Sequence, residues 1–382
     1  MGPLAGMKIV ELAGIGPVPF CSTLLSDMGA QVIRVDRTAP SGLGISGKNP
    51  AFDVLGRGRK SISVDLKNPE GVEAVLRLVE QADAIVEGFR PGVAERLGLG
   101  PDVCLARNEK IVYGRMTGWG QDGPVSHAAG HDINYIALSG VLYSCGTKDS
   151  GPVPPLNLTG DFGGGAMFLA FGVMAALWEA QRSGKGQVVD TSMLEGSAYL
   201  MLPIYGMHGS GFWSDERGTN ILDTGAPFYG TYETKDGKHI VLGGAEMHFA
   251  AAILNKMGRP DLIDVCQPPP GPNQNPAKEF LTETFLSETQ AYWVDWFDGV
   301  DAAFAPVNDL RQGADDPQLR HREMIIEDDR GWEHIGIPMK FRNEPGQVVF
   351  DLPALGQHTE ANLRNVGYTD ADIAAMRDKG VF

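Results

Sequence analysis

The first half of the chain alternates short apolar segments with helical segments, and this alternation limits the fold more than any other feature of the sequence. Strands are predicted at residues 8–12, 31–35, 61–64, 84–86, 111–116 and 187–190. Helical segments, several of them roughly 10–15 residues long, lie between them. A strand followed by a helix and a second strand is the unit from which parallel sheets are built. We therefore predict an α/β fold, with a large Rossmann-like domain over residues 1–190.

The second half of the chain follows a different pattern. Residues 229–234 and 239–243 alternate as two strands around Asp236-Gly237, and Asp-Gly at such a place is a strong signal for a β-hairpin. Periodicity weakens just before them, where Gly, Ser, Asn and Asp are frequent. We predict a linker at residues 191–224, a smaller α+β domain at 225–325, and a C-terminal segment at 326–382 that returns to the large domain.

Composition argues against several classes of function. The net charge is −16 at pH 7, which disfavours nucleic acid and a membrane surface as partners. Four irregularly spaced cysteines without a Cys-x-x-Cys pair predict neither a disulfide framework nor a zinc site. One long uncharged run, residues 162–178, is at the lower limit of the roughly 17–25 residues that span a bilayer. We predict a core helix there, and a soluble, cytoplasmic protein without a signal peptide.

The first strand–turn–helix unit invites comparison with dinucleotide-binding proteins. Asp36 falls about where such folds place the acid that binds the ribose. The glycine fingerprint fails, because Pro19 takes the third glycine position after Gly14 and Gly16. The sequence therefore does not favour NAD as a cofactor.

Four basic residues follow the ends of predicted strands. They are Arg37, Lys67, Arg90 and Arg96. Ligands of doubly wound sheets bind at the carboxyl ends of the strands. One or two arginines there are ordinary solvated charges, but four at equivalent places predict a phosphate-rich ligand.

Residues 130–166 carry two groups suited to acid–base chemistry. His131 and Asp161 each lie beside a glycine and at the start of a predicted helix. Free N–H groups at a helix start stabilise a developing anion, so the two side chains are candidates for acid and base on one substrate. The alternative from these residues alone is structural, a hydrogen-bonded pair in which Asp161 is a plain N-cap.

Several motifs give the chain a resemblance to the family III CoA-transferase fold and, within it, to the α-methylacyl-CoA racemases. The motifs cover most of the chain: Val10-Glu11-Leu12-Ala13-Gly14, Gly130-His131-Asp132-Ile133-Asn134-Tyr135, Leu156-Asn157-Leu158, Asp161-Phe162-Gly163-Gly164-Gly165, Gly184-Lys185-Gly186-Gln187-Val188 and Gly225-Ala226-Pro227-Phe228-Tyr229. The block that contains His131 is specific to the racemase branch. The resemblance implies an interlocked homodimer.

The resemblance also implies a reaction, a 1,1-proton transfer catalysed by an isomerase. An acyl-CoA with a methyl group at C2 loses its α-proton, passes through an enolate, and is reprotonated on the other face. The reaction needs no metal and no redox cofactor, and CoA is part of the substrate. His131 and Asp161 are implied as the two bases, with Asp132 as a further catalytic residue. Glu246 is implied to hold the imidazole of His131 in the right tautomer.

Two expectations about the site follow from these roles. Because His131 and Glu246 fall on different predicted domains, the site is expected at a domain or subunit boundary. The enolate oxygen needs hydrogen-bond donors, and we predict that the N–H of Asp161 and those of the helix beginning after it supply them.

CoA is expected along the first domain. The resemblance places its adenine, phosphate and pantetheine parts at Arg37, Val64, Asp65, Leu66, Lys67, Gly88, Phe89, Arg90, Arg96, Gly130, Ile133, Asn134 and Tyr135. The sequence departs from the racemase pattern at Met247-His248, where Pro-Gln is usual, and in the Pro-rich stretch 267–276. A branched fatty acyl, a sterol side chain and an aryl-propionyl group are all compatible acyl groups.

Two other functions compete with the racemase. In a family III CoA-transferase, Asp161 attacks a thioester and forms a mixed anhydride, with no need of His131 or Glu246. A non-catalytic acyl-CoA-binding protein keeps the arginines and has no use for an acid–base pair. The presence of both His131 and Glu246 in matching context favours the racemase.

Overall fold

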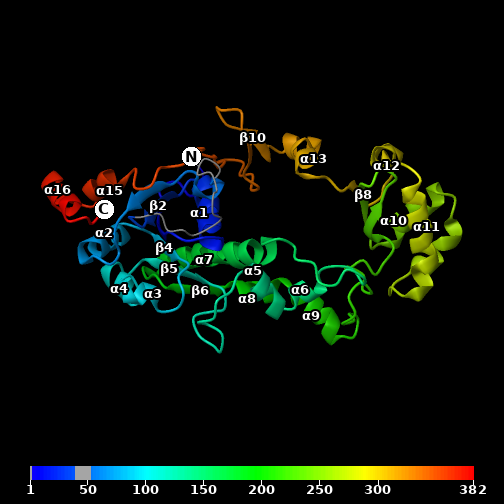
Figure 1. Cartoon of the computed structure of the whole chain (residues 1–382), viewed down its shortest axis with the longest axis horizontal. Helices are drawn as coiled ribbons and strands as arrows, with labels where there is room; N and C mark the ends of the chain where they lie inside the picture. The colour runs from blue at the N-terminus through cyan, green and yellow to red at the C-terminus, as the bar shows by residue number, and fades with distance from the viewer. Residues whose placement is uncertain (1, 39–52) are drawn as a thin grey trace. The chain divides into compact units, whose positions relative to one another are not determined.

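The structure is a computed structural model that describes residues 2–38 and 53–382 (Figure 1). The chain forms two compact units. Unit 1 comprises Met1–Ser139, Leu156–Leu200 and Arg320–Phe382, and unit 2 comprises Gly140–Pro155 and Met201–Leu319. The segment 191–224, predicted as a linker, contains the helices α8 (Met193–Leu200) and α9 (Leu202–Gly209).

A six-stranded parallel sheet forms the centre of unit 1, which confirms the predicted fold class. Its strands are β1 (Lys8–Leu12), β2 (Gln31–Asp36), β3 (Lys60–Ser63), β4 (Ala84–Glu87), β5 (Val112–Thr117) and β6 (Val188–Ser192). They lie in the order β3-β2-β1-β4-β5-β6, so the order reverses between β1 and β4. In open α/β sheets ligands bind at such a switch point, outside the carboxyl ends of the strands.

Apolar side chains cover both faces of this sheet, because successive residues of a strand point to opposite faces. On one face, Ile9 and Val86 pack with α1 (Pro17–Asp27) and α7 (Met167–Ser183). On the other, Val10 and Ile85 pack with α2 (Pro69–Val79) and α4 (Pro101–Arg107). The central strands β4 and β5 are therefore buried along their whole length, as is typical of a parallel sheet covered on both sides.

Four more helices belong to unit 1. They are η2 (Val54–Gly56), α3 (Val93–Arg96), α5 (Asp132–Leu138) and the π-helix η3 (Leu158–Ala166). η3 continues into α7, and Leu158–Ser183 is one candidate for a membrane span by length and composition among the described residues. Half of its most apolar window is buried inside the protein, as happens for core helices of soluble proteins.

The C-terminal part of unit 1 protects the outer edge of the sheet. The backbone N–H of Ser61 donates to Nδ1 of His358 (3.2 Å), and that of Ser63 donates to Oγ1 of Thr359 (2.9 Å). These contacts satisfy an edge strand that otherwise offers unpaired groups to other chains. The elements of this part are β10 (Ile325–Glu327), β11 (Glu333–Ile335), α15 (Thr359–Asn365) and α16 (Asp370–Asp378).

Unit 2 contains a three-stranded antiparallel sheet, β7 (Tyr229–Glu233), β8 (His239–Gly243) and β9 (Phe304–Pro306). The predicted hairpin at Asp236-Gly237 is confirmed, and Gly237 has the positive φ, 71°, that favours glycine. The helices α10 (Met247–Lys256), α11 (Asn275–Leu286) and α12 (Gln290–Phe297) lie beside the sheet (Figure 1). Shorter helices complete the unit: α6 (Val141–Ser144), η4 (Pro260–Leu262), η5 (Asp264–Cys266), η6 (Pro272–Gln274), α13 (Leu310–Ala314) and α14 (Pro317–His321).

Candidate active site

Asp161 lies on the π-helix η3, which begins at Leu158. The sequence predicts a helix that begins after Asp161, whereas η3 begins before this residue. Two close contacts hold η3 in place. The ring of Phe162 stacks on that of Phe20 in α1 at 4.5 Å, and a Cβ on Gly196 of α8 would lie 1.8 Å from a carbonyl oxygen of η3. π-Helical turns are rare in proteins, and those that occur are often found at functional sites.

Asp132 joins α5 to η3. It is only 5% exposed, and its Oδ2 accepts a hydrogen bond from the backbone N–H of Asp161 at 2.7 Å. Its Oδ1 is buried without a hydrogen-bond partner among the described residues. The two segments approach so closely that a Cβ on Gly160 would lie 2.4 Å from Oδ2 of Asp132. The N–H of Asp161, predicted as a donor to the enolate, is therefore already bound to Asp132.

The charge of His131 reaches the carboxyl group of Asp161. Burial raises the pKa of Asp161 above its ordinary value. Asn157 lowers it, because Nδ2 of Asn157 donates to Oδ2 of Asp161 at 2.9 Å; the charge of Asp132 raises it, and that of His131 lowers it. His131 itself is exposed, and its backbone N–H donates to Oδ1 of Asn134 at 3.0 Å. The pair thus joins a solvated imidazole to a partly buried carboxyl whose pKa is shifted towards neutrality, which suits acid–base chemistry.

Gly16, in the loop after β1, bounds the site beside Asp161. A Cβ at this position would lie 3.1 Å from Oδ2 of Asp161, and the backbone φ is 69°. A glycine is required here on both counts. Because Gly16 follows β1 at the switch point of the sheet, Asp161 faces the place where ligands of such folds bind.

The predicted CoA residues after β4 share this neighbourhood. Burial raises the pKa of Tyr135 to about 12; the charge of Asp161 adds to the rise, and that of Arg90 opposes it. The hydroxyl of Tyr135 donates to the carbonyl of Gly130. Gly88, which follows β4, packs against α1, since a Cβ there would lie 3.0 Å from Val18. The structure therefore brings Arg90, Gly130 and Tyr135 together with the acid–base pair.

The predicted CoA residues at positions 37 and 64–67 follow β2 and β3, at the same carboxyl ends of the parallel strands. The hydroxyl of Ser63 donates to the carbonyl of Arg37 at 3.1 Å, and Oδ1 of Asp65 accepts from the N–H of Lys67 at 2.9 Å. Val64 is buried, while Ile133 on α5 is exposed. Three strand spacings, roughly 14 Å, separate β3 from β4. An extended ligand is needed to contact both ends of this row, and CoA is such a molecule.

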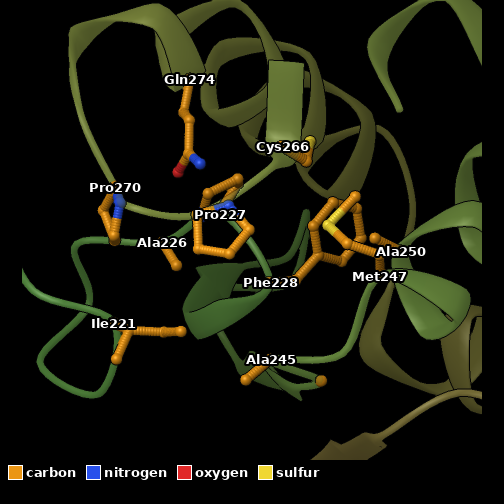
Figure 2. Close-up of a pocket in the computed structure, with 12 residues that line it drawn as sticks. Ile221, Ala226, Pro227, Phe228, Ala245, Met247, Ala250, Cys266, Pro270 and Gln274 are labelled. Atoms are coloured by element: carbon orange, nitrogen blue, oxygen red, sulfur yellow. The ribbon is translucent and has the colours of Figure 1, made fainter. Parts of the chain in front are cut away.

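Glu246 lies in unit 2, where it is exposed and precedes α10. Its pairing with His131 of unit 1 stays a prediction. Its neighbours Ala245 and Met247 line an apolar pocket with a volume of about 20 Å³ (Figure 2). Nε2 of the buried Gln274 donates to the carbonyl of Gln267 at 2.9 Å, and Oε1 has no partner among the described residues. A cavity of this size holds about one water molecule and is too small for an acyl chain.

Within residues 2–38 and 53–382, no cluster of three or more His, Cys, Asp or Glu side chains is arranged to hold a metal ion. The described site offers two acid–base groups, and a row of strand ends with basic residues.

Comparisons with known proteins agree with this description. The family model described as CoA-transferase family III matches residues 4–359. The α-methylacyl-CoA racemase of Mus musculus is 40% identical to the chain, covering 98% of the chain and 96% of the racemase. The succinyl-CoA:glutarate CoA-transferase of Mus musculus is 29% identical, covering 100% of the chain and 90% of the transferase. The crystal structure of a CAIB/BAIF family protein from Brucella suis has the same fold, with a TM-score of 0.80, 24% identity, and coverage of 96% of this chain and 99% of that one.

Proposed function

The chain belongs to CoA-transferase family III, and from this premise we propose that it is a racemase that interconverts the (R) and (S) forms of 2-methylacyl-CoA thioesters. The observation that carries the proposal is the pair of His131 and Asp161, two separate acid–base groups of which His131 lowers the pKa of Asp161, and which are connected through Asp132. Racemisation at one carbon needs an acid and a base on opposite faces. The greater identity to a racemase than to a transferase supports the same conclusion.

The reaction moves one proton in each step. In one direction, ionised Asp161 removes the proton from C2, and the electrons of the C–H bond become the enolate of the thioester. Protonated His131 then donates its proton to the opposite face of C2. In the other direction the roles are exchanged. Each turnover leaves both side chains with altered protonation, and exchange with solvent restores them. Because no electrons leave the substrate, we propose that the protein needs no redox cofactor.

The enolate oxygen requires donors other than the N–H of Asp161. The first turn of a helix has N–H groups that find no partner within the helix. For η3 these belong to Leu158, Thr159 and Gly160. We assign the stabilisation of the enolate to this turn, where removing one donor typically costs about 10²–10³ in rate.

Three further features belong to this proposal. The carboxylate of Glu246 orients the imidazole of His131, with the site at a domain or subunit boundary. The protein is a homodimer and acts in the cytoplasm. CoA lies along the strand ends from Arg37 to Arg90, and its basic neighbours there bind its phosphates.

Exchange of the α-proton tests the proposal. The protein is incubated with (R)- and (S)-2-methylacyl-CoA in D₂O, and C2 is followed by NMR, beside His131→Ala and Asp161→Asn variants. We expect one deuterium at C2 with loss of optical purity in the wild type. Each variant should impair exchange more strongly from one enantiomer than from the other. Equal losses for both enantiomers in both variants contradict the separate faces.

The second candidate is a CoA-transferase, which the name of the family and the partly buried Asp161 favour. An oxygen of Asp161 attacks the thioester carbonyl, the C–S bond breaks, CoA leaves as a thiolate, and an acyl anhydride forms. In the same experiment, CoA moving to an added free carboxylic acid without deuterium at C2 identifies this function and excludes the racemase.

A further inference from the structure

Arg115 contacts both ends of one loop of the predicted CoA site. It lies in the middle of β5, and its side chain is 10% exposed. Nε donates to Oε1 of Glu87 at 3.1 Å, and Nη2 lies 2.9 Å from Oε1 of Glu95. Glu87 is the last residue of β4 and Glu95 lies on α3. The segment between them, residues 88–94, contains Gly88, Phe89 and Arg90, so one guanidinium spans the two ends of this loop.

The carboxylate of Glu87, which binds Arg115, also binds the main chain of the loop. Its second oxygen, Oε2, accepts a hydrogen bond from the backbone N–H of Phe89 at 2.6 Å. Burial raises the pKa of Glu87, while the Phe89 N–H and the Arg115 guanidinium oppose the rise. Without Arg115, the ionised carboxylate is left buried without a counter-charge, which is strongly unfavourable. The hydrogen bond between Glu87 and the N–H of Phe89 therefore depends on Arg115.

Arg115 also offsets acidic charge at the loop. Residues 87–96 contain two acidic side chains, Glu87 and Glu95, and two basic ones, Arg90 and Arg96. The guanidinium of Arg115 pairs with both carboxylates. Burial raises the pKa of Asp190, its register partner on β6, and the charge of Arg115 opposes this rise as well. Arg90 and Arg96 therefore do not have to balance Glu87 and Glu95, which favours binding of the phosphates of CoA.

The loop has little freedom to adjust if this contact is lost. Gly92 has a φ of 77°, and a Cβ on it would lie 3.3 Å from Nη1 of Arg96, so the Arg96 side chain lies against the loop. On the other side Gly88 packs against Val18 of α1. The position of the loop therefore follows from the anchors at its two ends, and Arg115 holds both.

We propose that Arg115 is a positioning residue that fixes the loop 88–96 for the phosphate-bearing half of CoA and offsets the charge of its two carboxylates. The inference rests on the proposed function, since it assumes that a CoA thioester is the substrate. Arg115 acts through Glu87 and Glu95, and it does not act on the reacting carbon.

Calorimetric titration of the full chain with CoA and with pantetheine tests this role. Pantetheine lacks the 3′-phospho-ADP half of CoA, so the loop should not contribute to its binding. For Arg115→Met we expect the Kd of CoA to rise about tenfold, as for the loss of one charge-assisted contact, with the Kd of pantetheine unchanged. Arg115→Lys keeps the charge but lacks the planar fork that reaches two carboxylates, so it should lose affinity for CoA to a smaller extent.

Arg57→Met is the matched control, because Arg57 forms another buried ion pair of unit 1, with Asp27 at 2.5 Å. It should lower stability as Arg115→Met does, yet bind CoA as the wild type does. The inference is wrong if Arg115→Met loses equal affinity for CoA and pantetheine, or if it loses no affinity for CoA. It is also wrong if Arg57→Met loses as much affinity for CoA as Arg115→Met, or if Arg115→Lys binds CoA with wild-type affinity. A wild type that binds CoA but exchanges no α-proton refutes the proposed function and leaves the inference standing.

Discussion

Gly16 offers a sharp test of the role that we assign to Asp161. Its backbone has a φ of 69° and a ψ of −117°, a conformation that costs an L-residue with a side chain about 1–3 kcal/mol. A methyl group at this position would also lie 3.1 Å from Oδ2 and 3.4 Å from Cγ of Asp161. The carboxylate cannot yield without straining its 2.9 Å hydrogen bond to Asn157.

For Gly16→Ala we therefore expect two separable effects. The free energy of unfolding, measured in urea, should fall by about 1–3 kcal/mol. The rate of α-proton exchange should fall, but by less than the roughly 10²-fold that a displacement of about 1 Å typically costs, because a contact of 3.1 Å requires only a small movement of the carboxylate. The loss should be larger for the enantiomer that Asp161 deprotonates. Exchange is followed at C2 in D₂O from each pure enantiomer, at a temperature where the variant is folded.

Gly14→Ala is the control for this substitution. Gly14 lies in the same loop, but it has no positive φ, and the nearest atom to its Cβ would be a carbonyl oxygen at 4.0 Å. This variant should exchange at the wild-type rate. Wild-type exchange by Gly16→Ala, or an equal loss in Gly14→Ala, would refute the reasoning.

Two further substitutions test the site and the core. Asn157→Ala removes the donor that favours ionised Asp161, so the pKa of Asp161 should rise. The acidic limb of kcat/KM should then move to higher pH for the enantiomer that Asp161 deprotonates, and an unchanged or lowered limb speaks against this role. Arg59 and Glu11 form a fully buried ion pair at 2.6 Å. Arg59→Met should lower the free energy of unfolding in urea by about 3–5 kcal/mol, and a loss below about 1 kcal/mol, the level of a surface pair, contradicts it.

Much of the site was predictable, but its supporting contacts were not. His131, Asp161, Arg90 and Tyr135 were all candidates from the sequence, and the structure brings them into one neighbourhood. Asn157 belongs to one of the motifs, but no role for it followed from the sequence. Its hydrogen bond to Asp161 follows only from the helical geometry of this segment.

Glu87 and Arg115 were missed, although a signal was present. Both are charged residues within strands that are otherwise apolar, and a charge in a strand buried on both faces needs a partner. The sequence shows that such partners exist, but it does not show which ones. Glu87 and Arg115 are adjacent only because β4 pairs with β5 in register.

The π-helix marks another limit of sequence reasoning. A π-helix and an α-helix differ by one residue in the spacing of their hydrogen bonds, and the residues of η3 suit either. Close packing of Gly164 against Gly196 of α8 accompanies the wider turn. The glycine run Gly163–Gly165 was the one signal available, since it permits such an approach.

The sequence by itself determined the parallel sheet, the hairpin of unit 2 and the family, because periodicity, turn residues and motifs are local features of the chain. The tertiary structure decided which groups are free to act. The N–H of Asp161 is bound to Asp132, 29 residues away, and is lost to the enolate. The guanidinium of Arg115 joins two carboxylates on different elements. Hydrogen bonds between distant segments depend on how those segments pack, and no local pattern contains that information.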